Sequence, residues 1–264
     1  MTSMQPRRFE KKVIIVTGGA QGIGRASVER FCSEGADVAF LDRDRERGLS
    51  TSNELTAMYG TRAPHFIECD ITVATQVQAA VSTVLETHRR IDVLVNNAGV
   101  AAYFDAAQMS EAQWDSVFAV DLKAVWLCIR YVLPTMRKAR SGSIVNIASI
   151  HARMTHEGMF PYAAAKAGVI GLTRNLALDE GRHGIRANAI SPGYTRTRLV
   201  EEYFSHQPNP AEAEQRVLDV HPLHRIGTPA EIANVVAFLA SDEASFITGA
   251  EIAVDGGLSA KYAS

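Results

Sequence analysis

Residues 17–24 read Thr17-Gly18-Gly19-Ala20-Gln21-Gly22-Ile23-Gly24, a glycine-rich turn whose position sets the architecture of the chain. The turn follows the β-branched run of residues 13–17 and precedes an amphipathic stretch, residues 23–33, that closes at Gly35. Because residues 37–41 are again strand-like, the pattern predicts a strand–helix–strand unit. The positive end of such a helix can bind a pyrophosphate, which glycines allow to approach closely. A tight turn that only packs the helix on the sheet remains the alternative.

Strand-like and helical segments alternate along the rest of the chain. Short β-branched runs predict strands, and longer runs with a helical apolar period predict helices. The expected strands are residues 63–68, 92–96, 143–148, 186–190 and 251–254, and the expected helices are residues 74–88, 110–138, 162–181 and 230–239. This alternation predicts a doubly wound parallel sheet in a Rossmann-like, three-layer α/β/α fold.

We expect one domain, residues 1–264, because α/β domains commonly reach about 250 residues before they divide. No repeat, low-complexity tract or linker interrupts the pattern. Residues 193–228 are expected to be a long irregular segment, with breakers at Pro208, Pro210 and Pro222. Loops of this length are usually functional, so the segment predicts a substrate-binding loop or lid.

Composition argues against several classes of protein. With 47 % hydrophobic residues, 21 % charged residues and a formal net charge of −2, the chain has no basic excess for nucleic acid or an anionic membrane. It has no apolar run of about 18 residues and no secretion signal in its first twelve residues, so we expect a cytoplasmic protein. The three widely spaced cysteines predict neither disulfides nor a metal site.

Asp42 ends the second predicted strand, 24 residues after Gly18. A carboxylate at this spacing hydrogen-bonds the adenosine ribose hydroxyls of a dinucleotide and repels a 2′-phosphate, which favours NAD over NADP. Two alternatives stay open. Arg43 or Arg45 could cover a 2′-phosphate, or residues 43–47 could be only the solvated start of a helix.

Ser149, Tyr162 and Lys166 form a second group with a common chemistry. Tyr162 and Lys166 lie four positions apart in a helical segment, where an ammonium group stabilises phenolate and lowers the pKa of the phenol. A phenol with a free pKa of about 10 then becomes a usable base near neutral pH. Ser149, just beyond a strand, can hold the reacting oxygen. The spacing of Tyr and Lys alone is common on helix surfaces, so the interpretation depends on Ser149 and the nucleotide site.

The ordered motifs resemble those of the short-chain dehydrogenase/reductase family over about residues 11–257. The matching segments are the glycine turn 17–24, the Asn-Asn-Ala-Gly of residues 96–99, Ser149, the Tyr-x-x-x-Lys of residues 162–166, Pro192-Gly193, Thr248-Gly249 and the Val-Asp-Gly-Gly of residues 254–257. The resemblance implies hydride transfer between a nicotinamide cofactor and a hydroxyl or carbonyl group. It also implies a homo-oligomer, a dimer or tetramer formed through the long helices.

The resemblance further implies which residues meet the cofactor. Asp70 and Ile71 would contact the adenine, residues 97–99 would line the cofactor, and Lys166 would also hold the nicotinamide ribose. Thr197, which follows Pro192-Gly193 at the family's spacing, would contact the carboxamide. The full expected set is Gly18, Gln21, Gly22, Ile23, Gly24, Asp42, Asp70, Ile71, Asn97, Ala98, Gly99, Tyr162, Lys166, Pro192, Gly193 and Thr197.

Position 121 departs from the family pattern. Many members carry an asparagine here, which joins Ser, Tyr and Lys in a tetrad with a proton-relay water, whereas this chain has Asp121. We include Asp121 with Ser149, Tyr162 and Lys166 among the expected catalytic residues. A carboxylate near Lys166 favours the charged ammonium and raises its pKa, which predicts a working relay with a shifted pH profile. A purely structural role for Asp121 is the alternative.

Polar residues border the expected pocket and favour a small hydroxylated substrate over a steroid or a long acyl chain. They are His151, Arg153, His156, Glu157, Glu201, Glu202, Tyr203, His206 and Gln207. The leading hypothesis is an NAD-dependent dehydrogenase of a sugar or polyol, with Tyr162 as the general base. A 3-oxoacyl-acyl-carrier-protein reductase is the alternative enzyme, although such enzymes usually use NADPH. A non-catalytic dinucleotide-binding sensor is more remote, because Ser, Tyr and Lys are all retained.

Overall fold

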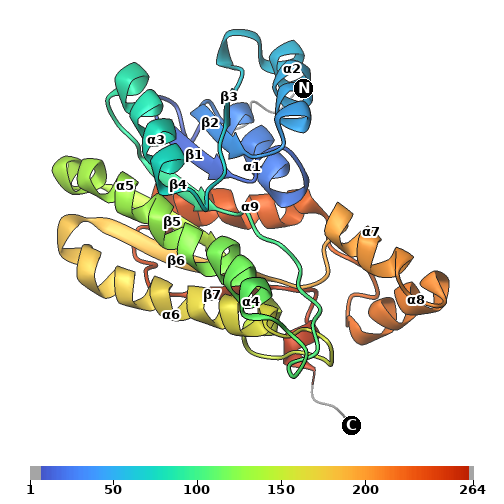
Figure 1. Cartoon of the computed structure of the whole chain (residues 1–264). Helices are drawn as coiled ribbons and strands as arrows, with labels where there is room; N and C mark the ends of the chain where they lie inside the picture. The colour runs from blue at the N-terminus through green and yellow to red at the C-terminus, as the bar shows by residue number, and fades with distance from the viewer. Residues whose placement is uncertain (1–6, 262–264) are drawn as a thin grey trace.

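The computed structural model of the chain describes residues 7–261. These residues form a seven-stranded sheet in the order β3-β2-β1-β4-β5-β6-β7, with neighbouring strands parallel (Figure 1). The strands are β1 (Val13–Thr17), β2 (Asp37–Asp42), β3 (His65–Glu68), β4 (Val93–Asn96), β5 (Gly142–Ile147), β6 (Ile185–Pro192) and β7 (Glu251–Val254). The predicted doubly wound parallel sheet is confirmed. The predicted domain and the segment searched for a secretion signal include residues 1–6, which lie outside the described residues, as do residues 262–264.

The central strands are apolar on both sides. All five residues of β1 are buried, with Val13 and Ile15 in one hydrophobic core and Ile14 and Val16 in the other. This follows from the strand period of two, which sends successive side chains to opposite faces. A parallel sheet with two apolar faces must be covered on both.

Two sets of helices cover the faces and close the two cores, which confirms the three-layer α/β/α fold (Figure 1). One set comprises α3 (Ala74–His88), α5 (Ala124–Ala139) and α6 (Tyr162–Glu180). The other comprises α1 (Gly22–Ser33), α2 (Arg45–Tyr59) and α9 (Pro229–Ala240). Within residues 7–261, none of the helices has the length and apolar character needed to span a bilayer.

The strand order reverses between β1 and β4, because β1 pairs with β2 on one side and with β4 on the other. In folds of this kind the connections that leave the two strands diverge and leave a crevice beyond their carboxyl ends. In open α/β sheets ligands bind in that crevice. The glycine turn, which directly follows β1, therefore lies at the reversal point.

Residues 110–138, predicted as one helical region, are interrupted. The chain forms α4 (Glu111–Phe118), then a π-helical turn at Ala119–Lys123, and then α5. The π turn contains Asp121, whose side chain is fully buried. Single π turns inside helices are frequent at functional sites.

The expectation of a long irregular segment at residues 193–228 is wrong. The segment contains α7 (Arg198–Ser205) and α8 (Pro210–Val220). Pro210 starts α8 instead of breaking a helix, because the first helical position needs no N–H donor, and Asn209 caps the turn by accepting from the Glu212 N–H.

The segment that contains α7 and α8 has its own small hydrophobic core, and its two ends are paired through backbone hydrogen bonds. Its apolar residues pack together around Val200, Phe204 and Val217. At its base, Thr195 and Gly227 form an isolated parallel bridge, with Gly227 N–H donating to the Tyr194 carbonyl at 2.9 Å. In Figure 1 the two helices project beside the sheet.

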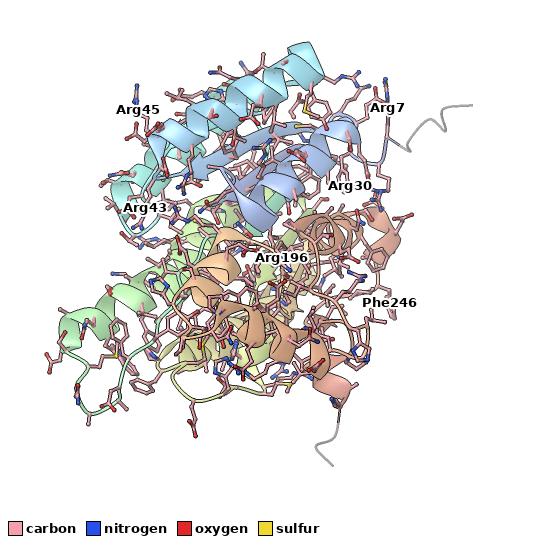
Figure 2. All side chains as sticks on the ribbon, turned by 90° about the vertical axis from the view of Figure 1, so that its right-hand side faces the viewer. Arg7, Arg30, Arg43, Arg45, Arg196 and Phe246 are labelled. Atoms are coloured by element: carbon pink, nitrogen blue, oxygen red, sulfur yellow. The ribbon has the colours of Figure 1, made fainter. Side chains whose placement is uncertain are left out.

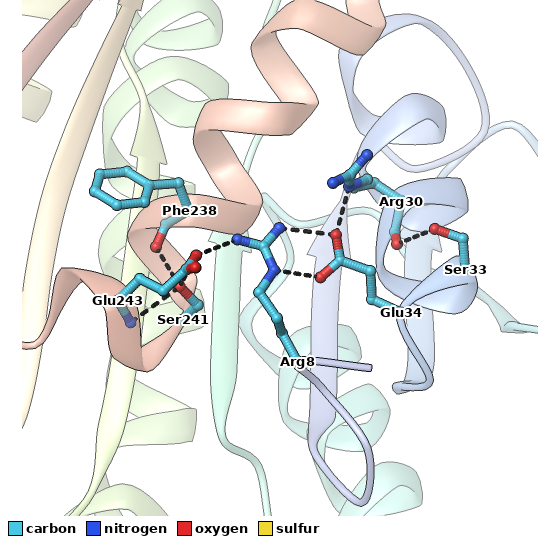
Figure 3. A network of polar contacts seen from close by, with 7 residues as sticks. All are labelled: Arg8, Arg30, Ser33, Glu34, Phe238, Ser241 and Glu243. Atoms are coloured by element: carbon cyan, nitrogen blue, oxygen red, sulfur yellow. Dashed lines mark hydrogen bonds and ion pairs between the residues drawn. The ribbon is translucent and has the colours of Figure 1, made fainter. Parts of the chain in front are cut away.

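A buried carboxylate joins the start of the chain to two other segments (Figure 3). The Glu34 side chain is fully buried at the end of α1, and Arg8 donates to it through Nε (2.6 Å) and through a terminal nitrogen (2.7 Å). Arg30 lies 2.6 Å from the same carboxylate, and Arg8 also donates to Glu243 at 2.5 Å. The network fastens the residues before β1 to α1 and to the turn after α9.

We expect Glu34→Gln to lower the free energy of unfolding by about 1–3 kcal/mol, because two arginines lose their charged partner where water cannot replace it. Urea denaturation at fixed protein concentration measures the loss. Glu54→Gln is the matched control, since Glu54 pairs with Arg25 at 2.7 Å but is half exposed. Equal losses in the two variants would contradict the interpretation.

Candidate active site

The glycine turn is hydrogen-bonded to the end of β4, its neighbour at the reversal point. The Thr17 Oγ1 atom accepts hydrogen bonds from the backbone N–H groups of Asn97 (3.0 Å) and Ala98 (3.1 Å). The Asn97 side-chain amide donates in turn to the carbonyl oxygens of Thr17 (3.0 Å) and Gly18 (3.1 Å). These contacts fix the turn against the segment 96–99, as the sequence motifs require.

Gly18 and Gly24 of the turn have no room for side chains. Gly18 has a φ of +64°, and a Cβ atom there would lie 2.9 Å from the Ala98 Cα. A Cβ atom at Gly24 would lie 2.0 Å from the Gly18 carbonyl oxygen. α1 begins at Gly22, its N-cap residue Gln21 makes no side-chain cap, and its first turn holds no acidic residue. These features fit the pyrophosphate of a dinucleotide, which would meet uncapped amide groups at a positive helix end.

Asp42 lies at the end of β2 beside the glycine turn. Its carboxylate accepts hydrogen bonds from the backbone N–H groups of Ala20 (3.1 Å) and Asp44 (3.0 Å). The side chain is therefore held in a fixed orientation at the edge of the crevice. A carboxylate in this place fits the two hydroxyl groups of an adenosine ribose.

The arginines after Asp42 differ in what they contact. Figure 2 shows Arg43 and Arg45 at the outer edge of the molecule, and Arg45 is paired with Glu68 at 2.7 Å. Arg47, in the first turn of α2, donates to the Gln21 side chain at 3.0 Å. Sequence reasoning assigned Arg47 only to a solvated helix start and missed this contact with the glycine turn, because nothing local links positions 21 and 47.

The other expected cofactor residues lie along the same edge of the sheet. The Asp70 Oδ1 atom accepts from the Thr72 N–H (2.9 Å) and hydroxyl (2.7 Å), which orients the carboxylate after β3. Thr197 is the N-cap residue of α7, and its methyl carbon would lie 3.2 Å from a Cβ atom at Gly22. Ile23 lies in the first turn of α1, Pro192 is the last residue of β6, and the residues that follow strands here are Ile71, Gly99 and Gly193.

A buried ion pair occupies the centre of the second group. The Lys166 Nζ atom lies 3.3 Å from Asp121 Oδ1 and donates to the Ile147 carbonyl at 3.3 Å. It also lies 5.5 Å from the centre of the Tyr162 ring. Asp121 Oδ1 accepts from the Val100 N–H at 3.1 Å, whereas its Oδ2 is buried and has no partner among residues 7–261. The Asp121 side chain itself therefore contacts Lys166.

Gly99 makes this ion pair sterically possible. A Cβ atom at Gly99 would lie 2.7 Å from Asp121 Oδ1 and 3.0 Å from Lys166 Nζ. Any side chain would push the carboxylate and the ammonium apart. The last glycine of the Asn-Asn-Ala-Gly motif thus serves the ion pair as well as the crevice.

Burial and charge act in opposite directions on these groups. Burial lowers the pKa of Lys166, but Asp121 and Tyr162 outweigh it and leave that pKa raised. Burial raises the pKa of Asp121 despite the opposing ammonium. The pKa of Tyr162 is raised, because burial and the Asp121 carboxylate outweigh the lowering by Lys166 and Ser149. The predicted effect of Lys166 on the phenol is present, but the net lowering that we predicted is wrong for the chain alone.

Ser149 follows β5 and is buried, with its Oγ atom accepting from the His151 N–H at 3.2 Å. Tyr162 is the first residue of α6, and the Ser149 hydroxyl favours its phenolate form, which lowers the pKa of the phenol. The structure thus brings together the four residues predicted to act in one reaction. The group can bind an oxygen atom and exchange its proton.

Only part of the predicted polar pocket lies near Tyr162. The His151 ring packs edge-on against Tyr162 with centres 5.9 Å apart, and His156 lies 5.1 Å from His151. Tyr203 of α7 lies 6.4 Å from His156. Other residues of the predicted pocket form ion pairs instead: Arg153 with Glu251, Glu201 with Arg196, and Glu202 with Arg198.

Two tyrosines of the pocket escaped the sequence analysis. Tyr103 stacks on Tyr203 with ring centres 6.4 Å apart, and Tyr194 lies 6.1 Å from the same ring. The Tyr194 hydroxyl is hydrogen-bonded to His156 Nε2 at 3.3 Å. No motif marks these positions, because they converge from separate loops only in the folded chain.

Residues 18–259 match the protein family described as Enoyl-(Acyl carrier protein) reductase. The chain is 40 % identical over 251 residues to the 3-oxoacyl-[acyl-carrier-protein] reductase FabG of Thermotoga maritima, covering 95 % of this chain and 99 % of the relative. It is 38 % identical over 265 residues to levodione reductase of Leifsonia aquatica, covering 99 % of both chains.

Solved structures agree with these relationships. A crystal structure of levodione reductase matches with a TM-score of 0.93 and 37 % identity, covering 97 % of this chain and 100 % of the other. The aldohexose dehydrogenase of Thermoplasma acidophilum matches with a TM-score of 0.86 and 37 % identity, covering 96 % of each. The predicted resemblance is confirmed: the chain belongs to the short-chain dehydrogenase/reductase family and is an oxidoreductase.

Proposed function

We propose that this oxidoreductase is an NAD-dependent dehydrogenase of a small hydroxylated substrate, a sugar or polyol. One observation carries the proposal: Ser149, Tyr162 and the Lys166–Asp121 pair converge near the glycine turn, where the N-terminus of α1 has no side-chain cap. NAD, when bound, supplies the hydride acceptor. The Ser149 hydroxyl binds the reacting oxygen, and the Tyr162 phenolate oxygen accepts its proton.

Lys166 has two tasks in this proposal. Its ammonium group stabilises the Tyr162 phenolate, which offsets part of the cost of burying that charge. It also binds the hydroxyl groups of the nicotinamide ribose. Asp121, together with Tyr162, raises the pKa of the buried Lys166, so its carboxylate supports both tasks and the relay of protons through Lys166.

The cofactor assignment rests on Asp42 and the glycine turn. In the proposal residues 18 and 21–24 hold the pyrophosphate, Asp42 the adenosine ribose, Asp70 and Ile71 the adenine, and residues 97–99 the length of the cofactor. Pro192, Gly193 and Thr197 hold the nicotinamide end. The Asp42 carboxylate is already fixed beside the turn, where a 2′-phosphate would meet its negative charge.

The pocket favours a polar substrate because imidazole and phenol groups surround Tyr162. Residues 193–228, which carry Tyr194 and Tyr203 into it, act in this proposal as the substrate-binding lid. One neighbour by structure is named an aldohexose dehydrogenase, which agrees with a sugar substrate. The 40 % identity to a 3-oxoacyl-[acyl-carrier-protein] reductase keeps that activity as the second candidate.

We also propose a homo-oligomer, a dimer or tetramer. Trp126 of α5 is 44 % exposed and Leu178 of α6 is 80 % exposed, both on the long helices that the family resemblance assigns to assembly. Large apolar side chains exposed on an outer layer are typical of association surfaces.

We expect the protein to bind NADH at least about tenfold more tightly than NADPH, and Asp42→Ser to reduce this ratio, because the variant no longer repels a 2′-phosphate. Titration of nicotinamide fluorescence measures both affinities. Asp44→Ser is the matched control, since serine retains the capping function of Asp44 at α2 and leaves Asp42 in place. A clear preference of the unaltered protein for NADPH would show that the cofactor assignment is wrong.

We expect Tyr162→Phe to lower kcat by about 10²–10⁴-fold while NADH binding is retained, because the variant loses the proton acceptor but keeps the ring. The reaction is followed as NADH formation with aldoses, polyols and secondary alcohols. A parallel assay of an acetoacetyl thioester with NADPH tests the second candidate. Turnover that survives the substitution would exclude Tyr162 as the base.

We expect Asp121→Asn to move the rising limb of the pH–kcat/KM curve for alcohol oxidation to lower pH. The Asp121 carboxylate raises the pKa of Tyr162, so its removal lets the phenolate form at lower pH. The phenolate itself raises the pKa of Lys166, which keeps the ammonium charged beside it in the variant. Asp115→Asn, an exposed position on α4, is the control. Superimposable curves for the Asp121 variant and the unaltered protein would favour a structural role for Asp121.

A further inference from the structure

His151 lies beside both groups that would hold the reacting oxygen. It belongs to the short 3₁₀ turn Ile150–Ala152 directly after Ser149, and its N–H donates to the Ser149 Oγ atom at 3.2 Å. Its ring meets the Tyr162 ring edge-on, with centres 5.9 Å apart and planes 72° apart. The imidazole and the phenol are therefore neighbours next to Ser149.

One nitrogen of the His151 ring is hydrogen-bonded within the protein, and the other has no partner among residues 7–261. Nδ1 is hydrogen-bonded to the Thr155 hydroxyl at 2.9 Å, which fixes the plane of the ring. Nε2 has no hydrogen-bond partner within residues 7–261 and is not fully buried.

The neighbouring histidine is different. His156 uses both ring nitrogens, Nδ1 with the Glu157 carbonyl at 2.8 Å and Nε2 with the Tyr194 hydroxyl at 3.3 Å. It packs edge-on against His151 and forms the wall behind it. Of these two rings beside Tyr162, His151 is the one with a nitrogen left for a ligand.

The His151 ring is neutral at physiological pH. Burial and, to a smaller extent, the adjacent His156 together lower its pKa to about 4. The titratable groups that face it are His156 and the phenol of Tyr162. A neutral imidazole whose Nδ1 is engaged can donate or accept at Nε2, according to its tautomer, so it suits a hydroxyl or a carbonyl oxygen.

We infer that His151 Nε2 binds a second oxygen of the substrate, on the carbon next to the one that reacts. The preferred substrates then carry two neighbouring oxygen groups, as in a vicinal diol or an α-hydroxy ketone. The inference rests on the proposed function, since it places the reacting oxygen between Ser149 and Tyr162. The stacked rings of Tyr103 and Tyr203 add flat walls that suit a ring-shaped carbon skeleton.

The test compares cyclohexanol with 1,2-cyclohexanediol, cis and trans, as substrates for NAD-linked oxidation. The two probes share a ring and differ in the second hydroxyl. We expect kcat/KM to be about tenfold higher for the diol, the value of one buried hydrogen bond. His151→Asn should lower kcat/KM for the diol about tenfold more than for cyclohexanol.

His151→Gln is the matched variant. A glutamine amide reaches approximately the position of Nε2, whereas an asparagine amide reaches approximately that of Nδ1. We therefore expect His151→Gln to retain part of the preference for the diol that His151→Asn loses. Equal losses with both probes in His151→Asn would show that His151 only supports Ser149 and would overturn the inference.

A second readout does not require turnover. In the complex with NADH, the ¹⁵N NMR signal of His151 Nε2, assigned with His151→Asn, should shift on addition of the diol and not of cyclohexanol. A shift without oxidation of either alcohol would refute the proposed dehydrogenase activity on these alcohols and support the His151 site. Oxidation without a shift or a changed ratio would refute the site and leave the dehydrogenase. Absence of both would refute both.

Discussion

The ion pair between Lys166 and Asp121 is the interaction on which the site depends. Lys166 is 4 % exposed and Asp121 is fully buried, so both charges have left water. The cost of removing two charges from water commonly cancels their attraction, which makes such a pair a poor source of stability. Its value lies in keeping a positive charge at a fixed place beside Tyr162. The π turn that carries Asp121 and the absent side chain of Gly99 both serve that placement.

The parallel sheet explains why this charge lies next to a dinucleotide site. All strands point the same way, so the segments after β1, β4 and β5 emerge at one edge. The glycine turn, residues 96–99 and Ser149 are these segments. The Lys166 Nζ atom donates a hydrogen bond to the backbone carbonyl of Ile147, which is the last residue of β5. The sheet that forms the cofactor crevice therefore also holds the lysine beside Tyr162.

Local pattern was enough to predict the strands, the glycine turn and the residues around Ser149, because each depends on neighbours in sequence. The errors arose at positions whose structure depends on segments that are distant in sequence. Pro210 was interpreted as a breaker although it starts a helix, and the contact of Arg47 with Gln21 has no local signal. The net pKa of Tyr162 depends on burial, and the open nitrogen of His151 depends on Thr155 and on the surrounding rings. Neither is visible in a motif.

The bridge between Thr195 and Gly227 has a consequence for how this scaffold diversifies. The chain leaves the body of the protein at this bridge, builds α7 and α8 around their own apolar cluster, and returns to the same point. The sheet and the ion pair lie outside this segment, whereas Thr197, next to Gly22, belongs to the proposed cofactor site. The part that begins with α7 is therefore exchangeable: replacing residues 198–226 by the corresponding piece of a relative changes one wall of the pocket and keeps Thr197, Ser149, Tyr162 and the ion pair.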